Sequence, residues 1–94
     1  MNYIYLVVTS TGYLRKTNQY GESIDPYYDW DEETNVSYHL SLAGACARIE
    51  HELAMYKKDY PDSECSNPVS REYEFKFADG TIEHWQIVQQ RLYN

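Results

Sequence analysis

The stretch Tyr73-Glu74-Phe75-Lys76-Phe77 alternates aromatic and charged side chains, and Asp79-Gly80 separates it from the apolar run Ile82 to Val88. Alternation with a period of two is the pattern of a β-strand with one buried face. Asp-Gly between two such runs is a strong signal for a β-hairpin. The sequence therefore predicts an antiparallel sheet that contains this hairpin.

The register of the hairpin is open. A two-residue turn pairs Phe77 with Ile82, whereas a one-residue bulge puts Trp85 and Ile87 on the side of the phenylalanines. A slip of one residue moves every side chain of a strand to the other face of the sheet. The two registers therefore predict different cores, and the sequence does not choose between them.

One amphipathic helix is predicted before the hairpin. Ser41 fits an N-cap, because its hydroxyl oxygen can accept a hydrogen bond from a free amide of the first turn. The helix should end at Asp59-Tyr60-Pro61, since the residue before a proline avoids the α region. Apolar residues recur between these limits at the three- to four-residue spacing of one helical face: Leu42, Ala45, Cys46, Ile49, Leu53 and Tyr56.

The remaining chain predicts short strands and loops. Tyr3 to Val8 is apolar on both faces, as expected of a central strand, and Tyr13 to Thr17 and Val36 to Leu40 are candidate strands. Asn18 to Asn35 and Pro61 to Ser70 are expected to be irregular connections.

The fold class that follows is α+β, in the order β(β)(β)αββ. Residues 1–94 form a single domain of two layers, in which one amphipathic helix packs on an antiparallel sheet of about four strands.

Composition limits the partners. The chain has 15 acidic and 8 basic residues, a net charge of −7, and 11 tyrosines. A negative field repels phosphate backbones, so a direct nucleic-acid partner is not expected and a basic protein partner is. Cys46 and Cys65 form no CxxC pair and are expected to be reduced thiols. With no secretory leader or membrane span recognisable in the sequence, we expect a cytoplasmic protein without membrane contact.

No motif of catalysis or metal binding is complete. His51-Glu52 begins like HExxH, but Met55 stands where the second histidine belongs. Asp29, Asp31 and Glu33 begin like a calcium loop that lacks its glycine and its final glutamate. The three histidines come from different predicted elements and form no triad. The chain is therefore not expected to be an enzyme, and neither a cofactor nor a metal ion is predicted.

One acidic, aromatic segment requires an explanation, because no basic residue lies between Lys16 and Arg48. Tyrosine and tryptophan are enriched at binding hot spots, and carboxylates attract a basic partner. The alternative is a surface loop whose rings fold onto the sheet. The candidate partner-binding residues are Glu22, Asp25, Tyr27, Tyr28, Asp29, Trp30, Asp31, Glu32 and Glu33.

In size, charge and lack of catalytic motifs, the chain resembles the small phage-encoded inhibitors of bacterial defence, of the anti-CRISPR and anti-restriction type. The resemblance rests on no shared motif, so it assigns no residue roles. It implies a phage or mobile-element inhibitor that binds a nucleic-acid-binding nuclease or effector complex, with carboxylates in the place of phosphates. Two alternatives remain: an immunity protein or antitoxin against a cognate nuclease toxin, and a homodimeric interaction module that pairs through a sheet edge.

Overall fold

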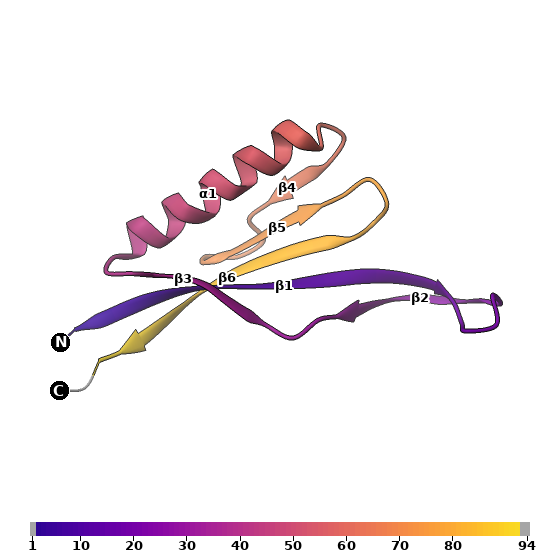
Figure 1. Cartoon of the computed structure of the whole chain (residues 1–94), viewed down its shortest axis with the longest axis horizontal. Helices are drawn as coiled ribbons and strands as arrows, with labels where there is room; N and C mark the ends of the chain where they lie inside the picture. Colours follow the sequence, from indigo (N-terminus) through magenta and orange to yellow (C-terminus); the bar gives the residue numbers. More distant parts are fainter. Residues whose placement is uncertain (1, 93–94) are drawn as a thin grey trace.

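The structure is a computed structural model that describes residues 2–92. Figure 1 shows one helix lying on one side of a sheet, with both chain ends at the left and the strands β1 and β2 reaching past the helix at the right. The elements in chain order are β1 (Tyr3–Thr17), β2 (Ser23–Trp30), β3 (Thr34–His39), α1 (Leu42–Asp59), β4 (Glu64–Ser66), β5 (Glu72–Lys76) and β6 (Ile82–Arg91).

All the strands form one antiparallel sheet. The order is β2-β1-β6-β5-β4, and β3 pairs with β1 as well. One side of β1 pairs with β6 over residues 3–12, and its other side pairs with β3 over residues 5–9 and with β2 over residues 12–17. The α+β class with one helix and an antiparallel sheet is confirmed, and the sheet has six strands instead of about four.

Two segments differ from the expected connections. Tyr13 to Thr17 continues β1 instead of forming a strand of its own, and the expected loop over residues 18–35 contains β2. Pro26 lies inside β2. It is tolerated there because β2 is an edge strand, where a missing amide breaks no ladder on the outer side. The connection after α1 likewise contains β4, which pairs with β5.

The helix begins and ends as predicted. The Ser41 hydroxyl accepts a hydrogen bond from the Gly44 amide at 3.0 Å, and the helix ends at Asp59, just before the non-helical Tyr60. Its buried residues Ala45 and Ile49 enter a core with one face of the sheet. The sheet contributes Val7, Phe75, Trp85 and Ile87 to that core.

The hairpin adopts the bulged register. Lys76 lies opposite Ile82, and Tyr73 lies opposite Trp85, one residue away from the pairing of a two-residue turn. The turn closes through Phe77, whose amide donates to the Thr81 carbonyl at 2.8 Å. Trp85 is thereby buried beside the phenylalanines, so the two-residue register is wrong and the bulged alternative is confirmed.

The helix covers only one face of the sheet. Side chains alternate between faces along a strand, so the residues next to the core residues in each strand point the other way. We call this second face the open face; it carries Val8, Ser10, Trp30, Glu74 and His84. Within residues 2–92 no helix covers the open face.

Candidate functional site

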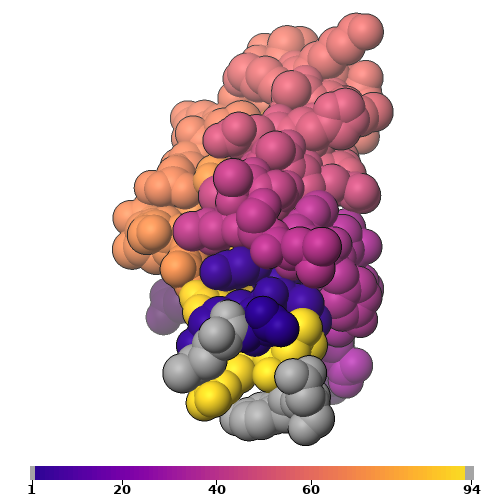
Figure 2. Space-filling view, turned by 90° about the vertical axis from the view of Figure 1, so that its left-hand side faces the viewer, coloured from indigo at the N-terminus to yellow at the C-terminus, as the bar shows by residue number. Residues whose placement is uncertain are grey.

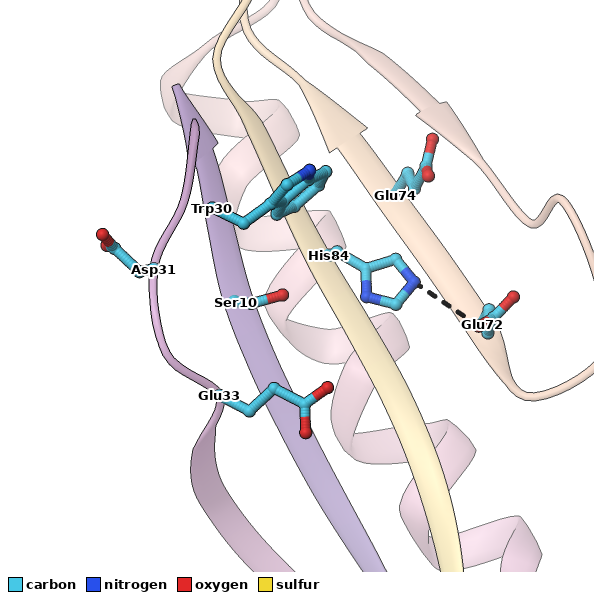
Figure 3. Close-up of a pocket in the computed structure, with 7 residues that line it drawn as sticks. All are labelled: Ser10, Trp30, Asp31, Glu33, Glu72, Glu74 and His84. Carbon is cyan, nitrogen blue, oxygen red and sulfur yellow. Dashed lines mark ion pairs between the residues drawn. The ribbon is translucent and has the colours of Figure 1, made fainter. Parts of the chain in front are cut away.

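The open face contains a hollow of about 440 Å³. Figure 3 shows this hollow with α1 behind the sheet, so that the site and the helix lie on opposite faces. The lining comes from β1, from the end of β2 and the residues after it, and from β5 and β6: Ser10, Trp30, Asp31, Glu33, Glu72, Glu74 and His84.

Trp30 lines the hollow with its indole ring. It lies opposite Gly12 in the β1–β2 ladder, and a Cβ at Gly12 would meet three carbons of the indole at 2.9 Å. The Tyr28 ring is 6.1 Å away, and the His84 ring meets the indole edge-on at 6.2 Å. Trp30 is still 46% exposed. The indole is therefore held by its neighbours and remains accessible to a partner.

Three glutamates line the hollow together with Trp30. Tyr73 and Phe75 of β5 face the helix, so Glu72 and Glu74 point to the open face, where Glu74 pairs with His84 across the ladder. Glu33 reaches the hollow from the segment between β2 and β3. No lysine or arginine lines the hollow. The lining of the hollow is therefore negatively charged.

His84 lies beside one of these glutamates. Its Nε2 lies 3.8 Å from Oε1 of Glu72, which is the contact drawn in Figure 3. Both side chains are partly exposed.

Asp31 lies at the rim of the hollow and interacts with Tyr13 of the same chain. Its carboxylate lies beside Tyr13 and raises the pKa of that phenol, mainly by electrostatic repulsion of the phenolate and in part by accepting its hydrogen bond. In Figure 3 the Asp31 side chain points away from the other six residues. We therefore assign the charge of the hollow to the glutamates.

The structure brings only part of the predicted binding segment into the site. Tyr28, Trp30 and Glu33 reach the open face, with Asp31 at its rim. Tyr27 and Asp29 lie on the opposite face of β2, where Asp29 forms an ion pair of 3.3 Å with Arg15.

The three other predicted residues are exposed outside the hollow. The Glu22 carboxylate accepts a hydrogen bond from the side-chain amide of Asn18 at 3.2 Å in the turn between β1 and β2. Asp25 lies near the start of β2, and Glu32 lies between β2 and β3.

Sequence reasoning missed Ser10, Glu72, Glu74 and His84. The sequence contained a signal for Glu72, Glu74 and His84, because the bulged register puts all three on the face opposite Phe75. The two-residue register instead placed His84 beside Phe75 and hid the site. Ser10 carries no local signal, since only the β1–β6 pairing brings it opposite His84.

Ser10, His84 and Glu72 have the residue types of a hydrolytic triad, but not its geometry. Ser10 and His84 are partners in the β1–β6 ladder, but no side-chain hydrogen bond joins them among residues 2–92. Ser10 also lies within β1, not on a sharp turn of the kind that exposes a catalytic serine. Nor do three His, Cys, Asp or Glu side chains of this described part come together to hold a metal ion.

No family model, no curated protein and no solved structure matches the chain. Its class is therefore defined by the fold and the site: a two-layer α+β protein with an aromatic, acidic hollow on an uncovered sheet face. None of the helices formed by residues 2–92 is long and apolar enough to cross a membrane.

Proposed function

We propose that this chain is a cytoplasmic binding protein that inhibits a nucleic-acid-binding protein by covering its basic surface. The partner docks on the open face, around Trp30. The observation that carries the proposal is a half-exposed indole, packed on Gly12, in a hollow bordered by glutamates and free of lysine and arginine.

An arginine side chain of the partner suits this hollow. Its guanidinium can lie over the indole of Trp30 in a cation–π contact and donate to Glu33, Glu72 or Glu74. Tryptophan is among the residues that contribute most to binding energy, because it buries a large area with little loss of conformational entropy. The glutamates add attraction over distance and exclude acidic partners.

The class of partner follows from charge. At −7, the chain repels nucleic acid and attracts basic proteins. Basic surfaces are typical of proteins that bind phosphate backbones. Docking on such a surface puts carboxylates where phosphates would bind, and this excludes the nucleic acid. No step of this function requires catalysis.

The test is capture of the partner with the tagged chain at low and high salt. The variant Glu33→Gln, Glu72→Gln, Glu74→Gln removes the charge of the hollow and keeps the shape of the side chains. We expect it to bind the captured partner at least about tenfold more weakly and with a smaller dependence on salt.

The matched control removes the same charge elsewhere. Glu22→Gln, Asp25→Asn, Glu32→Gln changes three exposed carboxylates of the acidic segment that lie outside the hollow. We expect this control to bind within about twofold of the wild type, because screened charges far from the contact contribute little. If both variants lost affinity equally, binding would depend on the overall negative charge of the chain and not on the hollow.

Inhibition is tested by competition. A labelled oligonucleotide bound to the purified partner should be released as the wild-type chain is added, and the triple hollow variant should not release it. A complex that holds the chain and the oligonucleotide together would contradict inhibition by occupation of the nucleic-acid site.

A further inference from the structure

The strand β3 forms a margin of the sheet. It pairs with residues 5–9 of β1, and among the described residues it pairs with no other strand. In Figure 2 the view is from the end with both chain termini, and the purple to magenta atoms of β3 and the segment after it form one side of the molecule, next to the indigo β1. Its outer backbone groups are therefore available to another strand.

The edge strands β2 and β4 carry protection that β3 lacks. Natural edge strands avoid association through charges, prolines or very short length. The edge strand β2 contains Asp25, Pro26 and Asp29, and β4 has three residues, one of them Glu64. Residues 34–40 contain no proline and no Asp, Glu, Lys or Arg. Neither a charge nor a proline in β3 therefore opposes pairing with another strand.

The same margin exposes apolar side chains. Tyr38 is 65% exposed, Leu40 is 87% exposed and Val36 is 37% exposed. An exposed apolar edge strand is unfavourable in an isolated protein and is typical of strands that pair with another chain.

We propose that β3 pairs antiparallel with β3 of a second copy, around a two-fold axis beside Tyr38. Each copy carries a charge of −7, so two copies repel wherever carboxylates come together. Contact through residues 34–40 brings no carboxylates together, because these residues include no Asp or Glu. A basic partner would find no countercharge on this strand, whereas a second copy finds an uncharged surface identical to its own.

The register supports the self-pairing. With Tyr38 opposite Tyr38 of the second copy, Val36 lies opposite Leu40, so that apolar residues meet across the interface. The bulge at the β1 pairing lies between Val7 and Val8, at the Val36 end, and leaves Ser37 to His39 regular. β3 ends at His39 and the chain bends at Leu40 and Ser41, although Ser41 itself keeps an extended backbone (φ −140°, ψ 153°).

The symmetry fixes what the dimer presents. A two-fold axis between antiparallel strands stands perpendicular to the sheet, so both helices lie on one side and both open faces on the other. The dimer therefore offers two hollows side by side. The dimer itself does not depend on the proposed function, although two hollows would strengthen binding to a partner with two basic sites.

The test is sedimentation of the full chain from micromolar to millimolar concentration. We expect the wild type to dimerise and Tyr38→Lys to raise the dissociation constant at least about tenfold, because it sets like charges opposite each other. Tyr20→Lys is the control: Tyr20 is 77% exposed in the turn before β2, and its charge change is identical. Circular dichroism confirms that each variant is folded.

A charge-swap mixture makes the test specific. Tyr38→Lys mixed with Tyr38→Glu should restore dimerisation, whereas each variant alone should dimerise more weakly than the wild type. A wild type that stays monomeric throughout, a dimer that Tyr38→Lys leaves intact, or a mixture that fails to dimerise would overturn the proposal. A monomeric wild type that still captures a basic partner would overturn the dimer alone. A dimer that captures none would count against the proposed function alone.

Discussion

The indole of Trp30 packs against Gly12 so closely that a Cβ at this glycine would come within 2.9 Å of three ring carbons. Glycine weakens a strand interior, and it often marks a place where another group approaches the backbone closely. Here that group is the ring at the centre of the candidate site. Gly12 belongs to β1, which pairs with β2 on one side and with β6 on the other. The missing side chain at Gly12 therefore sets the position of the Trp30 ring on the open face.

Gly12→Ala should displace the indole. We expect partner affinity to fall about tenfold, and overpacking to lower the free energy of unfolding by about 1 kcal/mol. Titration calorimetry and urea unfolding measure the two effects.

The double variant Gly12→Ala, Trp30→Phe provides the control. The smaller ring relieves the clash, so stability should recover while affinity stays low. Wild-type affinity in Gly12→Ala would show that the position of the ring does not matter for binding.

Ser41→Ala should destabilise the helix start. The Ser41 hydroxyl satisfies the Gly44 amide, and loss of such a cap costs about 1 kcal/mol. Urea unfolding measures the change. Ser66→Ala, in the exposed strand β4, serves as the control and should have a smaller effect. Equal stability of the two variants would contradict the capping role.

Tyr73 should make the protein less stable at alkaline pH. Burial, with a hydrogen bond to Cys46, raises the pKa of Tyr73 from 10.0 to about 12. The unfolded chain therefore releases the phenol proton first, so the free energy of unfolding falls as the pH rises from 10 toward 12. Burial raises the pKa of Tyr56 as well, which adds to the same decline.

Tyr73→Phe should make this decline shallower, because a phenylalanine has no proton to release. Urea unfolding at pH 10 and at pH 12 measures it, with Tyr20→Phe as a control at an exposed position. A decline as steep in Tyr73→Phe as in the wild type would assign the alkaline loss to other groups.

The elements with a clear local pattern could be predicted from the sequence. Ser41 and Pro61 bracket the helix, and the alternation before Asp79-Gly80 marks the hairpin, because these signals lie within a few residues of the structure they specify. β2 could not be recognised, since Asp25 and Pro26 disfavour strands. Its partner β1 supplies the ladder that overrides their preference.

The candidate site could be predicted only in part. Trp30 and Glu33 stood out in an acidic, aromatic segment, whereas Glu74 and His84 depended on a register that one bulge decides. The hollow joins residues from both ends of the chain through the β1–β6 pairing. Local pattern does not specify such long-range pairing.

The affinity of Trp30→Ala for the captured partner tests most directly whether the open face is the binding surface. The control is Tyr20→Ala, which removes an exposed ring from the turn before β2. We expect Trp30→Ala to lose about 2 kcal/mol or more of binding free energy, as truncation of a hot spot does, and the control to bind like the wild type. Wild-type affinity in Trp30→Ala would contradict the assignment of the binding surface to the open face.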